Sequence, residues 1–218
     1  MNPFTDPFFL IEVVGIVAFA ISGATVAIRA DMDWVGIVVL AVVTAVGGGT
    51  LRDVLMARGP VSWLLDAWPI WVSVLTAVLV ILEAYRNPKH PLDNRATILV
   101  ADAAGLAVFS VAGTGLALGR GIDPFNSVVL GLITGIGGGV MRDLLARQRP
   151  LVLVSQIYAL TSLANGVVYV GLSRLGVAPV VTRWAAVMAG LVLRLLAIRF
   201  RWSLPRPPSP TRDLPTRT

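Results

Sequence analysis

The stretch GGGTLRDVL (residues 47–55) recurs almost unchanged as GGGVMRDLL (residues 137–145), and both copies lie inside long apolar segments. The similarity extends beyond these two stretches at a constant offset of 90 residues. Matching positions include Gly15 with Gly105, Phe19 with Phe109, Gly23 with Gly113, Thr44 with Thr134, Pro60 with Pro150, and acidic Glu12 with acidic Asp102. An offset that holds without gaps over roughly fifty positions indicates an internal duplication.

The composition indicates an integral membrane protein. Of the 218 residues, 56% are hydrophobic and 14% are charged, and the mean hydropathy is +0.81. A soluble domain is about half apolar and about a quarter charged. The net charge of +6 does not indicate nucleic-acid binding, because Lys and Arg lie in loops beside the apolar segments, as orientation signals do.

The residue types present predict neither a metal site nor a cofactor. The sequence has no Cys, which excludes disulfides and thiolate ligands, and the single His90 has no second His to share a metal. A Ser-His-Asp arrangement or a group of metal ligands is not recognisable either. We therefore predict a protein that is not an enzyme and has no catalytic residues.

Seven apolar segments are long enough to cross about 30 Å of hydrocarbon, which predicts an all-α membrane protein with seven transmembrane helices. Pro69 removes a backbone donor, so the third helix is expected to bend or to begin late. The expected helices span residues 8–28, 35–57, 63–85, 97–118, 125–147, 152–172 and 181–200.

Each copy of the duplicated sequence holds three of these helices. Because three is odd, the second copy must enter the membrane from the opposite side. The sequence thus predicts two inverted three-helix repeats, at 8–88 and 97–175, followed by a seventh helix at 181–200. Residues 1–7 are expected to form a short tail, and the Pro-rich residues 203–218 a disordered tail.

Basic residues predict that the N-terminus lies outside and the C-terminus lies in the cytoplasm, in the inner or plasma membrane of the cell. With this orientation the outside loops hold only Arg58, Arg120 and Arg174. The inside loops and tail hold Arg29, Arg86, Lys89, Arg95, Arg147, Arg149, Arg199, Arg201, Arg206, Arg212 and Arg217.

The glycine triplets, Gly47, Gly48 and Gly49 in one copy and Gly137, Gly138 and Gly139 in the other, weaken two helices. Two interpretations are open and compatible. Small residues let helices pack closely, or a kink at the glycines lines a polar path, since freed carbonyls in a bilayer must face protein or water. The second gains support from spacing, because Thr44, Gly48 and Arg52 share one helix face, as do Thr134, Gly138 and Arg142.

Five hydroxyl residues are candidates for lining such a path, where they would replace part of a cation's hydration shell. The alternative is a hydrogen bond from each hydroxyl to the carbonyl four residues earlier in its own helix. The candidates are Ser22, Thr44, Ser110, Thr114 and Thr134. A filter sequence of the TVGYG type is missing, so any ion selectivity is expected to be modest.

Charges inside apolar segments are expensive unless they are paired or face water. Arg52 and Arg142 lie about 9 Å past their helix centres, at 1.5 Å per residue, so they sit near opposite membrane faces. Glu12 lies at the depth of Arg52, and Asp102 lies at the depth of Arg142. We predict the pairs Glu12–Arg52 and Asp102–Arg142, with Asp53 and Asp143 free to face aqueous vestibules.

A seven-helix chain with two GGGxxRD motifs in inverted repeats resembles the prokaryotic trimeric intracellular cation (TRIC) channel family, which is also labelled a glycine-transporter-domain family. The resemblance covers residues from about 8 to 200. It implies a homotrimer in membrane lipid, with one pore per subunit among helices 1, 2, 4 and 5. Helices 2 and 5 would be kinked at the glycine triplets, beside Arg52, Asp53, Arg142 and Asp143. The permeant ions it implies are K⁺ and Na⁺, chiefly K⁺.

A second function remains open from the sequence. A secondary transporter for a small solute such as glycine would use the same inverted repeats with broken helices. Unitary K⁺ currents would indicate a channel, and saturable glycine uptake without unitary currents would indicate a transporter.

Overall fold

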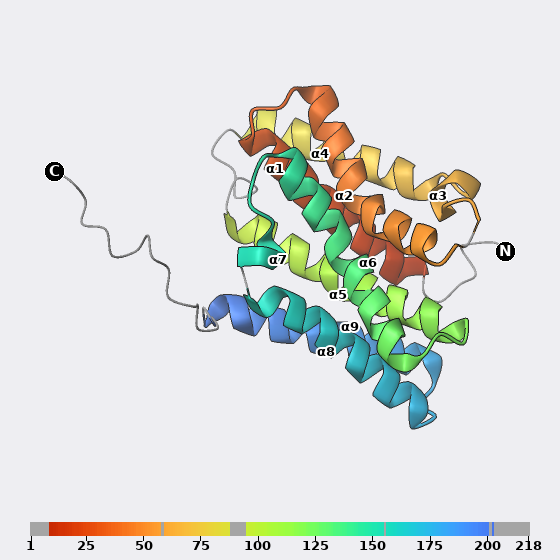
Figure 1. Cartoon of the computed structure of the whole chain (residues 1–218). Helices are drawn as coiled ribbons and strands as arrows, with labels where there is room; N and C mark the ends of the chain where they lie inside the picture. The colour runs from red at the N-terminus through yellow and green to blue at the C-terminus, as the bar shows by residue number, and fades with distance from the viewer. Residues whose placement is uncertain (1–8, 58, 88–94, 155, 201, 203–218) are drawn as a thin grey trace, which may run out of the picture.

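The structure of the protein is a computed structural model that describes residues 9–57, 59–87, 95–154, 156–200 and 202. Every secondary-structure element within these residues is a helix. The predicted tails at 1–7 and 203–218 and the loop residue His90 lie outside the described residues. Figure 1 shows the helices α1 (Phe9–Arg29), α2 (Trp34–Leu55), α3 (Ser62–Leu65), α4 (Trp68–Arg86), α5 (Arg95–Gly119), α6 (Pro124–Leu145), α7 (Leu151–Val154), α8 (Gln156–Arg174) and α9 (Pro179–Arg199).

Seven of these helices are long, in agreement with the predicted fold. Six of them, α1, α2, α4, α5, α6 and α9, have the length and hydropathy of a membrane span. The seventh, α8, is as long as α4, at 19 residues, but carries polar residues such as the buried Asn165. The protein is therefore an all-α, multi-pass membrane protein.

Two helix boundaries differ from the prediction, one of them at a proline. The predicted span 63–85 is divided into the short α3 and the long α4, and Pro69 lies in the first turn of α4. A proline there breaks no intrahelical hydrogen bond, because the first N–H groups of a helix have no partner within it. The predicted span 152–172 corresponds to α7 and α8, which lie on either side of residue 155, outside the described residues.

The backbone follows the sequence duplication closely. Asp33 caps the start of α2 by accepting a 2.7 Å hydrogen bond from the Gly36 N–H. Asp123 caps α6 in the same way, with a 2.9 Å bond from the Phe125 N–H. Past the ends of these helices, Ala57 and Arg147 take positive φ angles of 47° and 55°. Both copies thus begin and end their second helix at equivalent residues.

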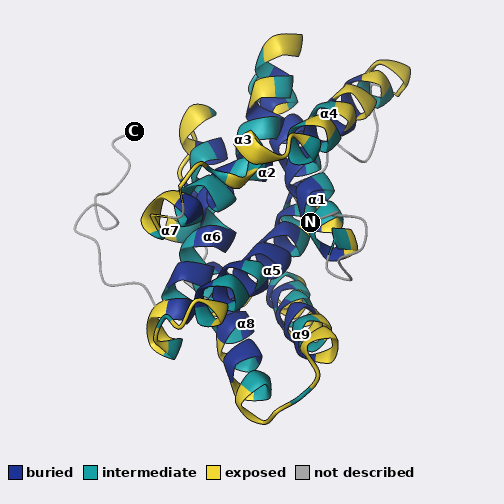
Figure 2. Ribbon diagram, turned by 90° about the vertical axis from the view of Figure 1, so that its right-hand side faces the viewer, coloured by how far each residue is buried: buried dark blue, intermediate teal, exposed yellow. Residues whose placement is uncertain are grey.

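The helices of the two repeats form one bundle around α1, α2, α5 and α6. Contacts between α1 and α5 and between α2 and α6 join the repeats, while α9 packs on α5 and α8. In Figure 2 the central helices are mostly buried, and exposed residues lie on the outer helices and at the helix ends. Exposed apolar side chains such as Leu75, Leu79 and Val192 suit contact with lipid.

Two glycines allow α2 and α6 to cross in direct backbone contact. A Cβ atom on Gly48 would lie 2.0 Å from the carbonyl oxygen of Thr134, and one on Gly138 would lie 2.1 Å from the carbonyl oxygen of Thr44. Any larger residue at either position would force the helices apart. These two glycines therefore allow close helix packing, which is the first of the two interpretations given above.

A pair of aromatic rings joins α1 to α5 in an equally symmetric way. Phe19 and Phe109 stack with their ring centroids 5.3 Å apart and their planes at 15°. Gly105 makes room for this pair, since a Cβ atom on it would lie 2.2 Å from the Phe19 ring, and Gly15 does the same for Phe109 at 3.2 Å. Because the two phenylalanines are equivalent residues of the repeats, the pseudo-two-fold axis passes between their rings.

The backbone contact predicts a large difference between glycines within one protein. We expect Gly48→Ala and Gly138→Ala each to lower the melting temperature in detergent by several degrees, roughly 2–4 °C for each kcal/mol lost. Gly171→Ala is the matched control, because a Cβ atom on this helical glycine would have nothing within 4 Å, and alanine favours helix by about 1 kcal/mol. Equal melting temperatures for all three variants, measured by thermal unfolding, would contradict the crossing.

Candidate functional site

The waist of the bundle, where α2 crosses α6 beside the phenylalanine pair, is fully packed. We use the name for Phe19, Thr44, Gly48, Thr134 and Gly138, all of which are buried. Both α2 and α6 remain helical through their glycine triplets. The outer members of the triplets are close to side chains, with Gly47 against Met141, Gly137 against Leu51, Gly49 near Arg52 and Gly139 near Tyr158.

Four of the five predicted hydroxyl residues bond to their own helix. Each donates a hydrogen bond of 2.6–2.9 Å to the carbonyl oxygen four residues earlier, and each is wholly buried: Thr44, Ser110, Thr114 and Thr134. These four hydroxyls therefore follow the alternative prediction, a hydrogen bond within their own helix. Ser22 differs, because its hydroxyl accepts a 2.6 Å hydrogen bond from Nη1 of Arg142.

The inner charge cluster contains the most deeply buried ion pair among the described residues. Arg142 has no exposed side-chain surface, and its Nη1 lies 2.6 Å from Oδ1 of Asp102. Its Nη2 lies 2.8 Å from Oδ1 of Asp143. The predicted Asp102–Arg142 pair is thus confirmed. Two carboxylates and the Ser22 hydroxyl surround one guanidinium, which satisfies a charge that a bilayer would otherwise make very unfavourable.

Asp143 lies in the wall of a cavity at the inner end of the bundle, but it is bonded there rather than free. Its side chain is 4% exposed. One carboxylate oxygen binds Arg142, and the other accepts a 2.8 Å hydrogen bond from the N–H of Leu151, the first residue of α7. The carboxylate therefore ties the end of α6 to the start of the short helix that follows, where the helix dipole favours negative charge.

The outer charge cluster repeats this arrangement at the other end of the bundle. Asp53, which is 1% exposed, lies 2.8 Å from Nη2 of Arg52 and accepts a 2.9 Å hydrogen bond from the N–H of Ser62, where α3 begins. The Ser62 hydroxyl also donates to Asp53. Asp53 thus lines a cavity at the outer end of the bundle and is held there by hydrogen bonds. Arg52 keeps 11% of its side chain exposed, whereas Arg142 keeps none.

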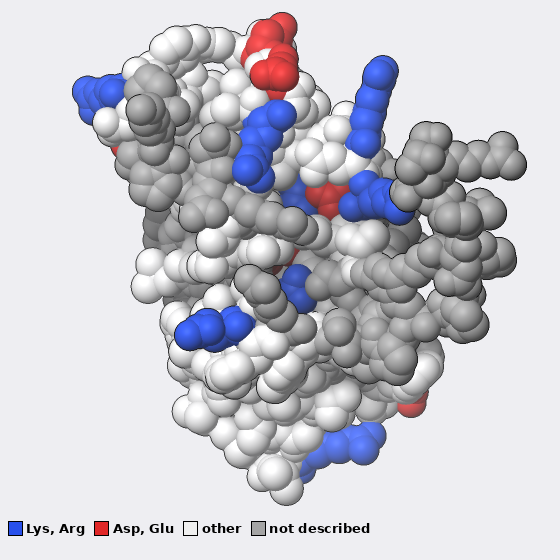
Figure 3. All heavy atoms as spheres, turned by 90° about the vertical axis from the view of Figure 1, so that its left-hand side faces the viewer, with Lys and Arg blue, Asp and Glu red and all other residues white. Residues whose placement is uncertain are grey.

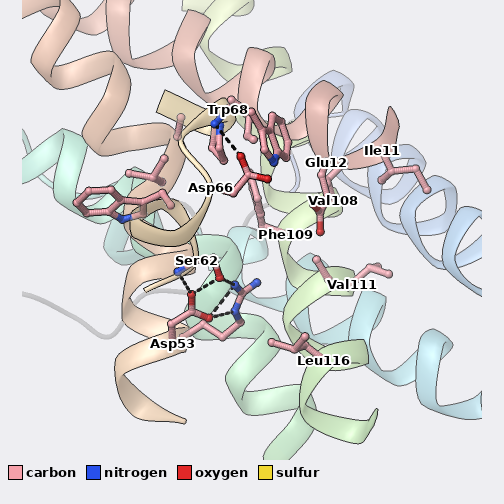
Figure 4. A pocket seen from close by; sticks show the side chains of 18 of the residues that line it. Ile11, Glu12, Asp53, Ser62, Asp66, Trp68, Val108, Phe109, Val111 and Leu116 are labelled. Carbon is pink, nitrogen blue, oxygen red and sulfur yellow. Dashed lines mark hydrogen bonds and ion pairs between the residues drawn. The ribbon is translucent and has the colours of Figure 1, made fainter. Parts of the chain in front are cut away.

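A cavity of about 390 Å³ opens beside the outer cluster. Figure 4 shows Glu12, Asp53 and Asp66 around it, with the Asp53–Ser62 hydrogen bonds at one side and apolar residues of α5 at the other. Arg52 and Arg183 also line it. Glu12 and Arg52 thus share one cavity, and their direct pairing stays a prediction.

A second cavity of about 480 Å³ lies beside the inner cluster and is lined by Arg142 and Asp143 together with Arg29 and Arg149. The face of the molecule at this end of the helices carries several projecting basic side chains and a small acidic and basic patch in a recess (Figure 3). Among the described residues, the two cavities share no lining residue, and the buried waist lies between them.

Four partners in these clusters were not recognised in the sequence: Ser62, Tyr158, Arg183 and Arg194. Ser62 opens a short helix that hydropathy did not separate from α4. The Tyr158 hydroxyl lies with Asp102 and Arg142 around Gly139, and the Arg194 guanidinium stacks 4.7 Å from the Tyr158 ring centroid. Arg183 and Arg194 are two of the three arginines in the apolar seventh segment, 181–200, and their charge was a signal that could have revealed them.

The described residues offer ion-pairing and hydrogen-bonding groups rather than a metal centre. In that part of the chain, no group of three or more His, Asp or Glu side chains is arranged to hold a metal ion. What the site provides is a pair of cavities, one at each end of the bundle, each reaching an arginine–carboxylate cluster.

Comparison with known proteins gives the same architecture. The family model described as "Glycine transporter" matches residues 9–84 and 99–174, once on each repeat. The UPF0126 inner membrane protein YadS of Escherichia coli K12 is 39% identical over 201 residues, covering 90% of this chain and 94% of YadS. The UPF0126 membrane protein YvgT of Bacillus subtilis is 37% identical over 197 residues, covering 90% of this chain and 94% of YvgT.

Solved structures agree with these relatives. The TRIC trimeric intracellular cation channel orthologue from Rhodobacter sphaeroides has a TM-score of 0.83 and 32% identity, covering 88% of this chain and 97% of the other. A chain from a study of conductance through TRIC cation channels has a TM-score of 0.78 and 35% identity, covering 94% and 98%. The fold and site thus define an inverted-repeat membrane protein whose structural neighbours are ion channels, not enzymes. The chain belongs to the glycine-transporter family, which is also the family of the prokaryotic TRIC channels.

The inner cluster predicts strong coupling between Arg142 and Asp102. We expect Arg142→Ala to lower the melting temperature, because it leaves two buried carboxylates without their partner. Adding Asp102→Asn should restore part of the loss, with an interaction energy of about 0.5–3 kcal/mol in a double-mutant cycle. The matched cycle pairs Arg142→Ala with Asp53→Asn, which lies in the other cluster and should be additive. Coupling of Arg142 to Asp53 but not to Asp102 would overturn the assignment.

Proposed function

We propose that the protein is a monovalent cation channel, with K⁺ as the main permeant ion and Na⁺ also permeant. The pathway runs from the outer cavity to the inner cavity between α1, α2, α5 and α6. The observation that carries the proposal is the pair of cavities, about 390 and 480 Å³, that reach the two charge clusters from opposite ends of the bundle. Inverted repeats commonly place a transport pathway at their interface.

The chemistry of the outer cavity suits a cation. Glu12, Asp53 and Asp66 line it, against the two arginines Arg52 and Arg183. Carboxylates raise the local concentration of cations, while the arginine partners keep any single ion from being held too tightly to leave. The absence of a TVGYG-type sequence fits modest selectivity between K⁺ and Na⁺.

The waist is the gate in this proposal. Phe19, Thr44 and Thr134 are at most 1% exposed, so this conformation is closed to ions at the α2–α6 crossing. Opening requires α2 and α6 to separate or bend at the glycine triplets, which are the weakest helical positions in either helix. The predicted kink at Gly47, Gly48, Gly49, Gly137, Gly138 and Gly139 belongs to that open state.

We also propose a homotrimer with one pore in each subunit, surrounded by membrane lipid. The similarity to the Rhodobacter sphaeroides protein, which is described as a trimeric channel, supports this assembly. The exposed apolar faces of the outer helices, which include Leu75 and Leu79 of α4, provide surface for both lipid and neighbouring subunits.

A secondary transporter of glycine or a similar solute is the second candidate. The description "Glycine transporter" of the matching family model favours it. Inverted repeats with a closed waist between two cavities also fit alternating access, in which the cavities open in turn. The two functions differ in how flux depends on solute concentration.

Reconstitution tests the proposal directly. Purified protein, whose mass in mild detergent should correspond to three chains, is placed in planar bilayers with KCl and in vesicles with labelled glycine. We expect unitary K⁺ currents with a smaller Na⁺ permeability and no saturable glycine uptake. Empty bilayers and the Gly138→Leu variant, whose side chain would fill the crossing, serve as controls. Saturable glycine uptake without unitary current would replace the channel with the transporter.

Orientation in the membrane is a further proposal, with the N-terminus outside and the C-terminus in the cytoplasm. The inner cavity end holds Arg29, Arg86 and Arg199 at the ends of α1, α4 and α9, as the positive-inside rule requires. The chain has no native Cys, so single cysteines can report sidedness. In intact cells an impermeant maleimide should label Arg120→Cys but not Arg86→Cys. The opposite pattern would reverse the orientation.

A further inference from the structure

The seventh long helix, α9, lies outside the duplication but carries two inward-facing arginines. Arg183 and Arg194 are separated by 11 residues, which is three turns at about 3.67 residues per turn. The two side chains therefore leave α9 from one face, about 17 Å apart along the helix axis at 1.5 Å per residue. This distance lets one helix reach both ends of the pathway.

Arg194 reaches the inner charge cluster. It is 2% exposed, and its guanidinium carbon lies 4.7 Å from the centroid of the Tyr158 ring. The Tyr158 hydroxyl in turn lies beside Asp102 at Gly139. A buried guanidinium needs opposite charge close by. Arg194 thus belongs to the group formed by Asp102, Arg142 and Asp143.

Arg183 reaches the outer charge cluster. It is half-buried and lines the outer cavity together with Glu12, Arg52 and Asp53. The apolar neighbours of this group fix the approach of α9, because Val187, one turn after Arg183, packs in the same apolar cluster as Ile11. Glu12 follows Ile11 directly in α1, so Glu12 of α1 and Arg183 of α9 line one cavity.

Each repeat by itself provides two carboxylates and one arginine at its end of the bundle: Glu12, Asp53 and Arg52 outside, and Asp102, Asp143 and Arg142 inside. Each group therefore carries one negative charge in excess. The other charged residues that line the two cavities are exposed, where water screens them: Asp66 at the outer cavity, and Arg29 and Arg149 at the inner cavity. One arginine from α9 at each end removes the excess.

We propose that α9 is a charge-balancing helix, in which Arg183 and Arg194 set the electrostatic potential of the outer and inner ends of the cation pathway. This inference rests on the proposed channel function for its effect on ions. Arg183, next to the open cavity, limits how many cations collect there. Arg194, fully enclosed, keeps the inner cluster neutral and so keeps the Asp102–Arg142 pair in place.

The outer arginine is tested by ionic strength. At about 10 mM salt, where the Debye length is ~30 Å, Arg183→Gln should raise K⁺ flux by about threefold and raise the K⁺/Cl⁻ permeability ratio. At about 1 M salt, where the length is ~3 Å, its flux should equal that of the wild type. Arg183→Lys should keep the wild-type dependence. Arg174→Gln, an exposed arginine at the same end that does not line the cavity, is the matched control. An unchanged dependence in Arg183→Gln would overturn the proposal.

The inner arginine is tested without conduction. Arg194→Gln should lower the melting temperature in detergent, Arg194→Lys should restore it, and adding Asp102→Asn should recover at least roughly 2 °C relative to additive shifts. Arg199→Gln, exposed on the last turn of α9, is the control. Additive shifts would remove Arg194 from the inner cluster. If Arg194 and Asp102 are coupled but the protein conducts no K⁺, the charge-balancing role of α9 stands and the channel function is overturned.

Discussion

The direct contact between α2 and α6 is the constraint on which the other features of the bundle depend. Gly48 and Gly138 each face a threonine carbonyl oxygen on the opposite helix at a distance that admits no side chain. Since both helices are fixed at this point and run in opposite directions, their arginine-bearing ends are carried to opposite ends of the bundle. The two charge clusters are therefore separated by the crossing, and each has its own cavity.

Burial of the arginines is made possible by groups that are close in sequence as well as by distant ones. Asp53 and Asp143 each follow an arginine directly, and each also accepts a hydrogen bond from the first turn of a short helix. One carboxylate thus satisfies a guanidinium and a backbone N–H together. Arg142 gains Asp102 and Ser22 in addition, which explains why it is more fully enclosed than Arg52.

The sequence alone was sufficient for the helices, the inverted repeat and the Asp102–Arg142 pair, because hydropathy, a constant offset and depth along a helix depend on local geometry. The bonds made by Asp53 and Asp143 were not predicted, because both carboxylates were expected to be free. The prediction used only the angle of about 100° between neighbouring residues on a helix. It did not consider the length of an arginine side chain, which can fold back on its neighbour, or the N–H groups of a later segment. Arg194 was missed since the duplication contains no equivalent of α9.

The stacked rings of Phe19 and Phe109 lie on the axis that relates the repeats, so each repeat is the other's packing partner at equivalent atoms. An insertion of one residue between the phenylalanine and the glycine triplet of one copy would rotate one contact away while leaving the other in place. Neither copy can then change its length alone over this interval. The constant offset of 90 residues therefore indicates that the two halves of the gene have diverged in their side chains while keeping a common length.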